Sequence, residues 1–479
     1  LCDVPPEVKA WSGTYDPEQI DNDPAAVISG RLSIAGDELE AVNRAEVRKV
    51  VRRMKENDGV KVFAVSGYAG SVNPEHELLV KQIIEEETDL HVCCGHELSD
   101  LLNFYVRANT AVLNARIIPL LEAFLQDIEA SLQGYGISAP IMVVKGDGSL
   151  MSAAMAKERP IETILSGPAA SIAGARYLTG ADNATVIDVG GTTSDIGCIS
   201  EGLVEVCPKG AKVGGWRTHV RALDMSTLGL GGDSEILYEE QQLTIGPKRI
   251  APISWLGAQY DLQRPLEFLE RRVDYYLTTT MPLEFLVPTK VSRGLDLSES
   301  ERQILAALAD GPCSLIELTE RVDAGHWIML RTKRLEDAYV LQRCGLTPTD
   351  ILHLEDRMDL WDKQSAEKFA GIVRKRMKFE RDEFSAHIFG KITDRLITEL
   401  MKKQLELDEH SDSCPACSAV LENILSGGNG RFHLSAQFFH PLVGLGAPVG
   451  FFTEEIPQKV QVEIVIPENA DVANAVGAI

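Results

Sequence analysis

The sequence contains no apolar run that approaches the roughly 18 residues needed to cross a membrane, and it opens without the pattern of a secretory signal peptide. We therefore expect a cytoplasmic protein that does not associate with a membrane. Positive charge is also scarce, because 47 Lys and Arg stand against 71 Asp and Glu, giving a formal charge of −24. This balance repels nucleic acid and anionic lipid, so neither is an expected partner.

Cysteine is present, but not in the pattern of a disulfide framework. The nine cysteines are mostly single and lie in apolar contexts, which indicates reduced thiols in a cytoplasm. A hydrophobic content of 44% and a charged content of 25% are typical of globular proteins, and 479 residues predict two to four domains. Because the chain begins at Leu1 rather than Met, we expect the sequence to start inside a longer protein.

Hydrophobic periodicity predicts an alternation of helices and strands. We expect helices over 41–56, 75–87, 98–133 (two, separated near Pro119) and 367–407, and a small-residue helix near 471–478. Strands are expected over 60–65, 141–144, 185–189 and 461–466, and another ending at Ser166. This alternation favours an α/β fold with largely parallel strands.

The sequence pattern changes near residue 295, where signals for short helices begin. Ser298 to Glu301 and Ser314 to Glu317 have the spacing of capping boxes, so two short helices should begin there. A third helix over 327–338 would complete a three-helix unit resembling a winged helix. One interpretation is DNA binding through Arg331, Lys333 and Arg334, and the other is an inserted packing or interaction subdomain. The strongly negative charge favours the second interpretation.

The most informative motif follows the predicted strand at 185–189. Asp188 lies at the end of that strand, and Gly190 and Gly191 permit a turn whose amide groups bind an anion. Thr192, Thr193 and Ser194 then offer hydroxyls to phosphate oxygens, while Asp188 or Asp195 can hold a hydrated Mg²⁺. A tight turn with polar decoration is the alternative, but the order of these residues favours phosphate binding.

Four further glycine-rich segments occupy turns at the ends of predicted elements, and each alone is also compatible with a simple turn. The segment 145–149 contains Asp147 between two glycines, and 163–170 places Pro168 where a helix can begin. The segment 224–234 contains Asp224, Gly231 and Gly232, and 443–448 contains Gly444, Gly446 and Ala447. Their combination with the motif at 188–195, in this order, indicates a nucleotide site.

These motifs together resemble the hydantoinase A/5-oxoprolinase family, which also includes subunits of acetone and acetophenone carboxylases. The resemblance extends from residues 71–76 and 107–115, through 148–151, 165–169, 188–195 and 228–234, to 444–448 and 473–478. The pair formed by 165–169 and 188–195 is the most specific part. The family belongs to the actin-like ATPase superfamily.

The resemblance implies two ribonuclease-H-like domains with ATP between them and an inserted small helical subdomain. The implied domains are 1–115, the remainder of the first; 116–290, the second; 291–350, the insert; and 351–479, the rest of the nucleotide-binding core. The family's first phosphate hairpin is absent and is expected upstream of Leu1. The implied nucleotide contacts are Gly190, Gly191, Thr192, Thr193, Gly231, Gly232 and an adenosine loop of Gly444, Gly446 and Ala447.

The implied activity is ATP-dependent hydrolysis of a cyclic amide, such as a hydantoin or 5-oxoproline, after phosphoryl activation of its carbonyl. Asp188 and Asp195 would hold Mg²⁺ with ATP, and Asp224 or Asp147 would contact a second metal or water. Two alternatives stay open: a carboxylase subunit acting on a ketone, and a nucleotide-binding activator of a metalloenzyme. We also expect a homo-oligomer and a hydantoinase-B-like partner subunit.

Three potential metal ligands lie outside these loops. His410, Cys414 and Cys417 have workable spacing for a structural zinc or an iron–sulfur contact. No second CxxC exists, although Cys93, Cys94 and His96 would complete a site if the fold brought them there. The alternative is a surface loop with two reduced thiols.

Overall fold

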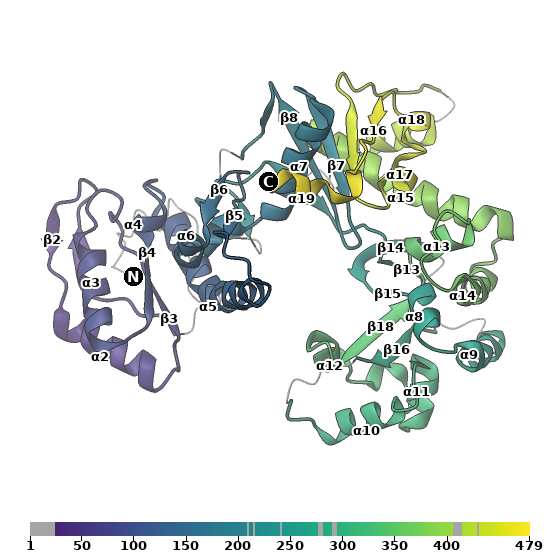
Figure 1. The fold of residues 1–479 in the computed structure, drawn as a ribbon, viewed down its shortest axis with the longest axis horizontal. Coiled ribbons are helices and arrows are strands. Elements are labelled where there is room, and N and C mark those ends of the chain that lie inside the picture. Colours follow the sequence, from purple (N-terminus) through teal and green to yellow (C-terminus); the bar gives the residue numbers. More distant parts are fainter. Residues whose placement is uncertain are drawn as a thin grey trace. The chain divides into compact units, whose positions relative to one another are not determined.

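The computed structural model describes residues 24–207, 210–213, 216–239, 242–275, 281–289, 295–405, 414–428 and 431–479 (Figure 1). These residues form two compact units. The first holds the chain up to 182 together with 197–225 and 473–479, and the second holds 183–196 and 226–472. The chain passes between the units within β8 (Ser194–Ser200) and β12 (Met225–Leu228). The predicted domain boundaries, which rest on the family's architecture, remain predictions.

The N-terminal part of the first unit contains the predicted α/β pattern. Strands β3 (Val62–Val65) and β4 (His91–Cys94) pair in parallel, and α2 (Arg44–Glu56) and α3 (Glu75–Glu87) contribute to the same core. Asn43 caps α2 by accepting hydrogen bonds from the amides of Ala45 and Glu46. Two short strands, β1 (Arg31–Leu32) and β2 (Glu38–Glu40), precede these elements. The predicted helices and strand are confirmed here, with ends that shift by a few residues.

Helix α5 (Phe104–Gly134) corrects the expected break at Pro119, because it runs through that proline without interruption. A proline inside a helix costs about 3 kcal/mol. Both halves of α5 are nevertheless held by buried contacts, since Ile118 packs with Cys93 and Leu125 packs with Met151. Tertiary packing on each side of Pro119 therefore outweighs the local penalty. Within the described residues, neither α5 nor any other helix has the length and apolar character to span a membrane.

The strand expected to end at Ser166 is also wrong. The segment forms a 3-10 helix, η1 (Pro160–Thr163), and then Leu165 takes a left-handed conformation (φ 64°) before α7 (Ser166–Thr179) begins. Long-range hydrogen bonds fix this path: the Asn114 side chain accepts from the Ile161 amide, and the Glu162 carbonyl accepts from the Gly146 amide. The predicted helix start near Pro168 is confirmed. Helix α7 packs against α19 (Ala473–Gly477), the expected small-residue helix.

The remaining elements of the first unit are short and surround α5 and α7. They are α4 (Gly95–Leu98), β5 (Met142–Val144), β6 (Leu150–Ser152), α6 (Ala153–Glu158), β9 (Leu203–Val204), β10 (Lys212–Val213) and β11 (Trp216–Arg217). Strand β5 confirms the strand expected at 141–144.

The second unit is organised around three parallel strands. Strand β7 (Ala184–Val189) pairs with β19 (Leu442–Leu445), and β19 pairs with β20 (Ile464–Val465), which is shorter than the strand expected at 461–466. The helical region expected at 367–407 forms two helices, α14 (Lys363–Met377) and α15 (Arg381–Gln404). Both supply residues to one large hydrophobic core that also includes Ile187 and Val189 of β7.

Other elements of this unit cover that core or connect its parts. They are β13 (Ser234–Glu239), β14 (Gln242–Arg249), β15 (Ala251–Pro252), α8 (Ile253–Gln259), α9 (Gln263–Tyr275), α13 (Pro348–Leu354), α16 (Pro415–Ser426), α17 (Val449–Thr453), α18 (Ile456–Lys459) and η4 (Ala470–Val472).

The expected three-helix unit forms a subdomain of the second unit. It contains β16 (Phe285–Pro288), α10 (Glu299–Ala307), β17 (Cys313–Ser314), α11 (Leu315–Arg321), η2 (Trp327–Met329), α12 (Lys333–Asp337) and β18 (Leu341–Gly345). The capping box at Ser298 and Glu301 is complete, whereas Ser314 caps α11 from one side only. The third helix is broken into η2 and α12. Strand β18 joins the subdomain to the core, because it pairs with β16 and with β15.

Candidate functional site

The loop after β7 has the form expected of an anion-binding turn. Strand β7 is buried, and it places Asp188 next to its carboxyl end. The turn closes with a hydrogen bond from the Gly190 amide to the Thr193 carbonyl (2.9 Å). Gly191 and Thr192 are exposed, and no group within the described residues hydrogen bonds to their amides. Two free amides at an exposed turn are suited to phosphate oxygens.

A second glycine loop is bonded directly onto this turn. The amides of Gly232 and Asp233 donate to the carbonyls of Gly190 (3.0 Å) and Gly191 (2.7 Å). A Cβ atom on Gly231 would lie 2.6 Å from the Gly190 carbonyl oxygen, so only glycine permits this approach. Gly231 and Gly232 are buried, so they support the turn from the side that faces the protein interior.

Ser194 has a different role from the phosphate contact assigned to it from the sequence. Its side chain is fully buried, and its hydroxyl donates to the Leu230 carbonyl at 2.7 Å. This bond adds a third link between the turn and the second glycine loop. Thr192 is the exposed hydroxyl residue of the motif, whereas Thr193 is half-buried and its side chain hydrogen bonds to Asp195.

The third glycine loop reaches the same place through the register of the sheet. Leu445 of β19 lies opposite Asp188 of β7, so Gly446 follows directly beside the carboxyl end of β7. Gly446 has a φ of 88°, and a Cβ atom there would lie 2.1 Å from the Val189 carbonyl oxygen. Ala447 is exposed next to it, whereas Gly444 is buried inside β19. Three motifs far apart in the sequence thus converge around Asp188.

The acidic residues of this site repel one another. Burial raises the pKa of Asp195, and the negative charge of Asp188 raises it further, while a hydrogen bond from Thr227 (2.6 Å) acts in the opposite direction. Burial likewise raises the pKa of Asp233, opposed by its ion pair with Arg249 (3.0 Å). Neighbouring carboxylates beside free amides are suited to a divalent cation that accompanies phosphate.

Asp147 and Asp224 belong to the first unit, whereas Asp188 belongs to the second. Asp147 accepts hydrogen bonds from the amide and hydroxyl of Ser149. Burial acts to raise the pKa of Asp147, but these hydrogen bonds and Lys145 outweigh it and lower the pKa. The assignment of Asp224 or Asp147 as a contact to a second metal or to water remains a prediction.

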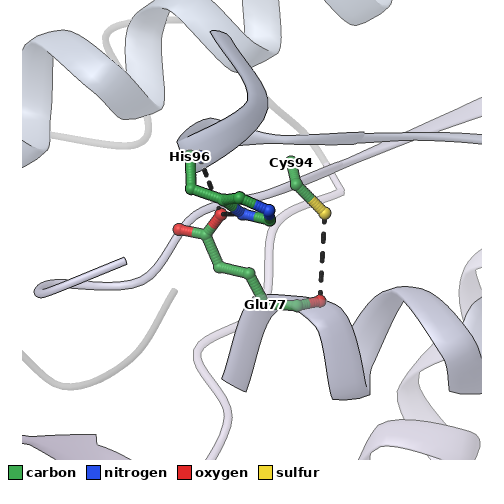
Figure 2. A group of neighbouring side chains, drawn as sticks. All are labelled: Glu77, Cys94 and His96. Atoms are coloured by element: carbon green, nitrogen blue, oxygen red, sulfur yellow. Dashed lines mark hydrogen bonds and ion pairs between the residues drawn. The ribbon is translucent and has the colours of Figure 1, made fainter. Parts of the chain in front are cut away.

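The predicted cysteine site divides into a part that is described and a part that is not. Cys414 and Cys417 lie at the start of α16, while His410 lies outside the described residues, so this site remains a prediction. Of the other candidates, Cys94 and His96 do come together, and Glu77 of α3 joins them, with one ligand atom of each within 4.8 Å of the others (Figure 2). Cys93 instead accepts a hydrogen bond from Asn114.

The Glu77 cluster is already satisfied by hydrogen bonds within the protein. The Glu77 carboxylate, whose side chain is 1% exposed, accepts from the amides of Gly67 (2.7 Å) and His96 (2.9 Å) and bonds to His96 Nδ1 (2.7 Å). Arg107 is fully buried nearby and donates to the carbonyls of Gly67 and Tyr68. Since a buried cation already balances this carboxylate, we interpret the cluster as a structural clasp between α3 and α4.

A feature that the sequence did not indicate lies beside Asp233. Its partner Arg249 lines a cavity of about 1400 Å³ between the core of the second unit and the inserted subdomain. The lining comes from segments separated by up to about 130 residues, so no local motif indicates it. The only local signal was the basic segment at Arg331, Lys333 and Arg334, which we considered for DNA.

Two family models match parts of this chain. The family model described as hydantoinase/oxoprolinase matches residues 107–255, and the model of the hydantoinase/oxoprolinase N-terminal region matches residues 9–88. The chain therefore carries domains of the hydantoinase/oxoprolinase type, and the turn at 190–193 and the second glycine loop lie within the first of these matches.

Two individual relatives resemble this chain, and they differ in the reactions that their names describe. The chain is 28% identical over 226 residues to caprolactamase subunit alpha of Pseudomonas jessenii, covering 46% of this chain and 32% of the relative. It is 26% identical over 243 residues to the acetophenone carboxylase gamma subunit of Aromatoleum aromaticum, covering 48% and 32%. The chain thus spans about a third of the length of these relatives.

A solved structure shares the fold. The nucleotide-free structure of acetone carboxylase, an enzyme of ATP-dependent acetone carboxylation, superposes with a TM-score of 0.59 at 15% identity. The match covers 94% of this chain and 51% of that chain. The mixed α/β architecture is therefore that of a known ATP-dependent enzyme, although this likeness speaks for the fold alone.

Proposed function

We propose that this protein is an ATP-dependent hydrolase of cyclic amides, of the hydantoin or 5-oxoproline type, that activates a carbonyl by phosphorylation. The observation that carries the proposal is the convergence of three glycine loops around Asp188, with two free amides at Gly191 and Thr192. The match of residues 107–255 to the hydantoinase/oxoprolinase model supports the reaction class. We further propose that the nucleotide-binding fold consists of two ribonuclease-H-like domains.

In this proposal each residue of the site has a separate task. The Gly191 and Thr192 amides and the Thr192 and Thr193 hydroxyls bind phosphate oxygens. Asp188 and Asp195 hold a hydrated Mg²⁺, which when bound supplies positive charge to the phosphates and relieves the repulsion between the two carboxylates.

The chemistry then follows from position and charge. Fixing the terminal phosphate beside the substrate carbonyl allows the phosphoryl group to pass to the carbonyl oxygen. ADP leaves as the phosphoryl group transfers, and the carbonyl carbon becomes electrophilic enough for water to add. The C–N bond then breaks, and its electron pair stays on the nitrogen, which takes up a proton. A second water releases the phosphoryl group as orthophosphate and leaves the carboxylate. Gly231, Gly232 and Ser194 contribute by holding the turn in place, so that little reorganisation is needed when the nucleotide binds.

A second candidate function is a carboxylase subunit that activates a ketone or bicarbonate by the same phosphoryl transfer. The relative that acts as an acetophenone carboxylase subunit favours it. The caprolactamase and acetophenone carboxylase relatives are both subunits, which supports the proposal that this chain works with a hydantoinase-B-like partner. The third alternative, an activator of a metalloenzyme, depends on the site at Cys414 and Cys417.

The test is an ATPase assay of the protein with panels of candidate substrates. Hydantoin, 5-oxoproline and caprolactam form one panel, and ketones with bicarbonate form the other. We expect ATP hydrolysis to rise only with a cyclic amide, and the Asp188→Asn variant to lose that stimulation. Stimulation by ketone and bicarbonate alone would favour the carboxylase, and undiminished turnover in Asp188→Asn would refute the assigned site.

A further inference from the structure

A large cavity lies within the second unit. It measures about 1400 Å³ and lies where β14, β15 and β18 meet α10 and α12 of the inserted subdomain. Pockets that bind small molecules usually measure about 300–1,000 Å³, so there is room for a ligand of considerable size. The pairing of β18 with both β15 and β16 ties the subdomain to the core beside this cavity.

The lining of the cavity is more positive than the chain as a whole. Its acidic residues number four, Asp233, Glu301, Glu336 and Asp337, against six cations. The cations are Lys248, Arg249, Arg331, Lys333, Arg334 and Arg343. Across the whole sequence the acids lead by 71 to 47. Three of these cations are held by carboxylates of low exposure, because Lys248 pairs with Glu235 and Glu284, Arg334 with Glu301, and Arg343 with Glu284 and Glu336. The other three, Arg249, Arg331 and Lys333, are the ones that favour an anionic ligand.

Several of these cations are available to a ligand. Arg331 forms no hydrogen bond or ion pair within the described residues, and it precedes α12 at the edge of the cavity. Lys333 pairs with Asp337, but its side chain is 86% exposed. Arg249 pairs with Asp233 and is 62% exposed. Exposed ion pairs contribute little to stability. Exchanging Asp337 or Asp233 for an anionic group of the ligand therefore costs little free energy.

Two indole rings contribute to the apolar part of the wall. Trp255 and Trp361 are half-buried and line the cavity. The Trp361 ring lies parallel to the ring of His353, with 5.9 Å between centroids, which orients it. Cations beside flat apolar surfaces suit a ligand that combines negative groups with a carbon skeleton.

The cavity is also connected to the phosphate-binding turn. Arg249 bonds to the Asp233 carboxylate, and the Asp233 amide donates to the Gly191 carbonyl. A ligand anion that attracts Arg249 would weaken the ion pair between Arg249 and Asp233. Because the Asp233 amide bonds to the turn, the effect of the ligand would pass to the turn through this single residue.

We propose that this cavity binds a small polyanion, carrying two or more phosphate or carboxylate groups, between the inserted subdomain and the core. Binding itself does not depend on the ATPase proposal. Its consequence does rest on the proposed function: occupancy changes the affinity of the turn at 190–193 for Mg-ATP. The basic residues of α12 therefore serve a small ligand within the protein, and not a DNA groove.

The test is titration calorimetry of the chain at low ionic strength without nucleotide. The probes are sodium pyrophosphate and sodium citrate, which separate phosphate from carboxylate preference, and a short DNA duplex. We expect one-to-one binding of pyrophosphate or citrate that weakens at least about tenfold in Arg331→Glu. The control is Arg264→Glu, which removes an exposed arginine of α9 outside the cavity and should leave the affinity unchanged.

Each other outcome overturns the proposal. If neither small anion binds, or if Arg331→Glu leaves its affinity unchanged, the ligand does not use this cavity. Equal weakening by Arg264→Glu would indicate non-specific attraction, and preferential binding of the duplex would restore the DNA interpretation. Because these titrations contain no ATP, failure of the proposed ATPase activity would leave their result interpretable.

Discussion

Replacing Gly231 by alanine should loosen the phosphate-binding turn by a calculable amount. The added Cβ atom would lie 2.6 Å from the carbonyl oxygen of Gly190 and from the carbonyl carbon of Gly191, closer than real contacts permit. Either the loop or the turn must move, and overpacking of this kind costs about 1–3 kcal/mol. Movement also stretches the hydrogen bonds from Gly232 and Asp233, each worth about 1 kcal/mol.

The sum is a loss of about 3–5 kcal/mol in the free energy of unfolding. Denaturant unfolding followed by tryptophan fluorescence measures it, and calorimetry with Mg-ATP should show at least about a tenfold weaker affinity. The matched control is Gly371→Ala in α14, where a Cβ atom meets nothing within 4 Å. Alanine there should stabilise by up to about 1 kcal/mol. Wild-type stability and Mg-ATP affinity in Gly231→Ala would refute this account of the loops.

Two further predictions concern buried polar groups of the second unit. Ser194→Ala should lower the free energy of unfolding by about 1–3 kcal/mol, because the buried Leu230 carbonyl loses its donor, and an unchanged unfolding midpoint would contradict the assigned bond. Burial and a hydrogen bond to Glu284 raise the pKa of Glu235 to about 8 from its ordinary 4.5. Its stabilising contribution is therefore complete below 4.5 and is lost as the pH rises through about 8. Unfolding midpoints measured across this range should fall in the wild type and stay level in Glu235→Gln; parallel curves would contradict the shift.

Local sequence patterns were sufficient to predict several elements of the fold. Helix α3 coincides with the range expected from its apolar spacing, and β7 begins one residue before the expected strand. The turn at 190–193 was predictable because glycines after a buried strand have few other uses. The capping box at Ser298 was likewise visible from its spacing.

Long-range contacts determined what the sequence could not show. The helix through Pro119 persists because residues on both sides of it are buried against distant segments. Gly446 reaches Asp188 only through the register between β19 and β7, which are separated by about 250 residues. Ser194 resembles its exposed threonine neighbours in sequence, yet it faces the Leu230 carbonyl once the second glycine loop packs there.

The central claim is that the turn beside Asp188 binds nucleotide together with a divalent cation. Calorimetric titration of ATP with Mg²⁺, and again with a chelator, tests it most directly. We expect wild-type protein to bind ATP more tightly with Mg²⁺, and Asp188→Asn to lose that difference while the exposed control Asp310→Asn retains it. Equal Mg²⁺ dependence in all three proteins, or no binding of ATP by the wild type, would contradict the account.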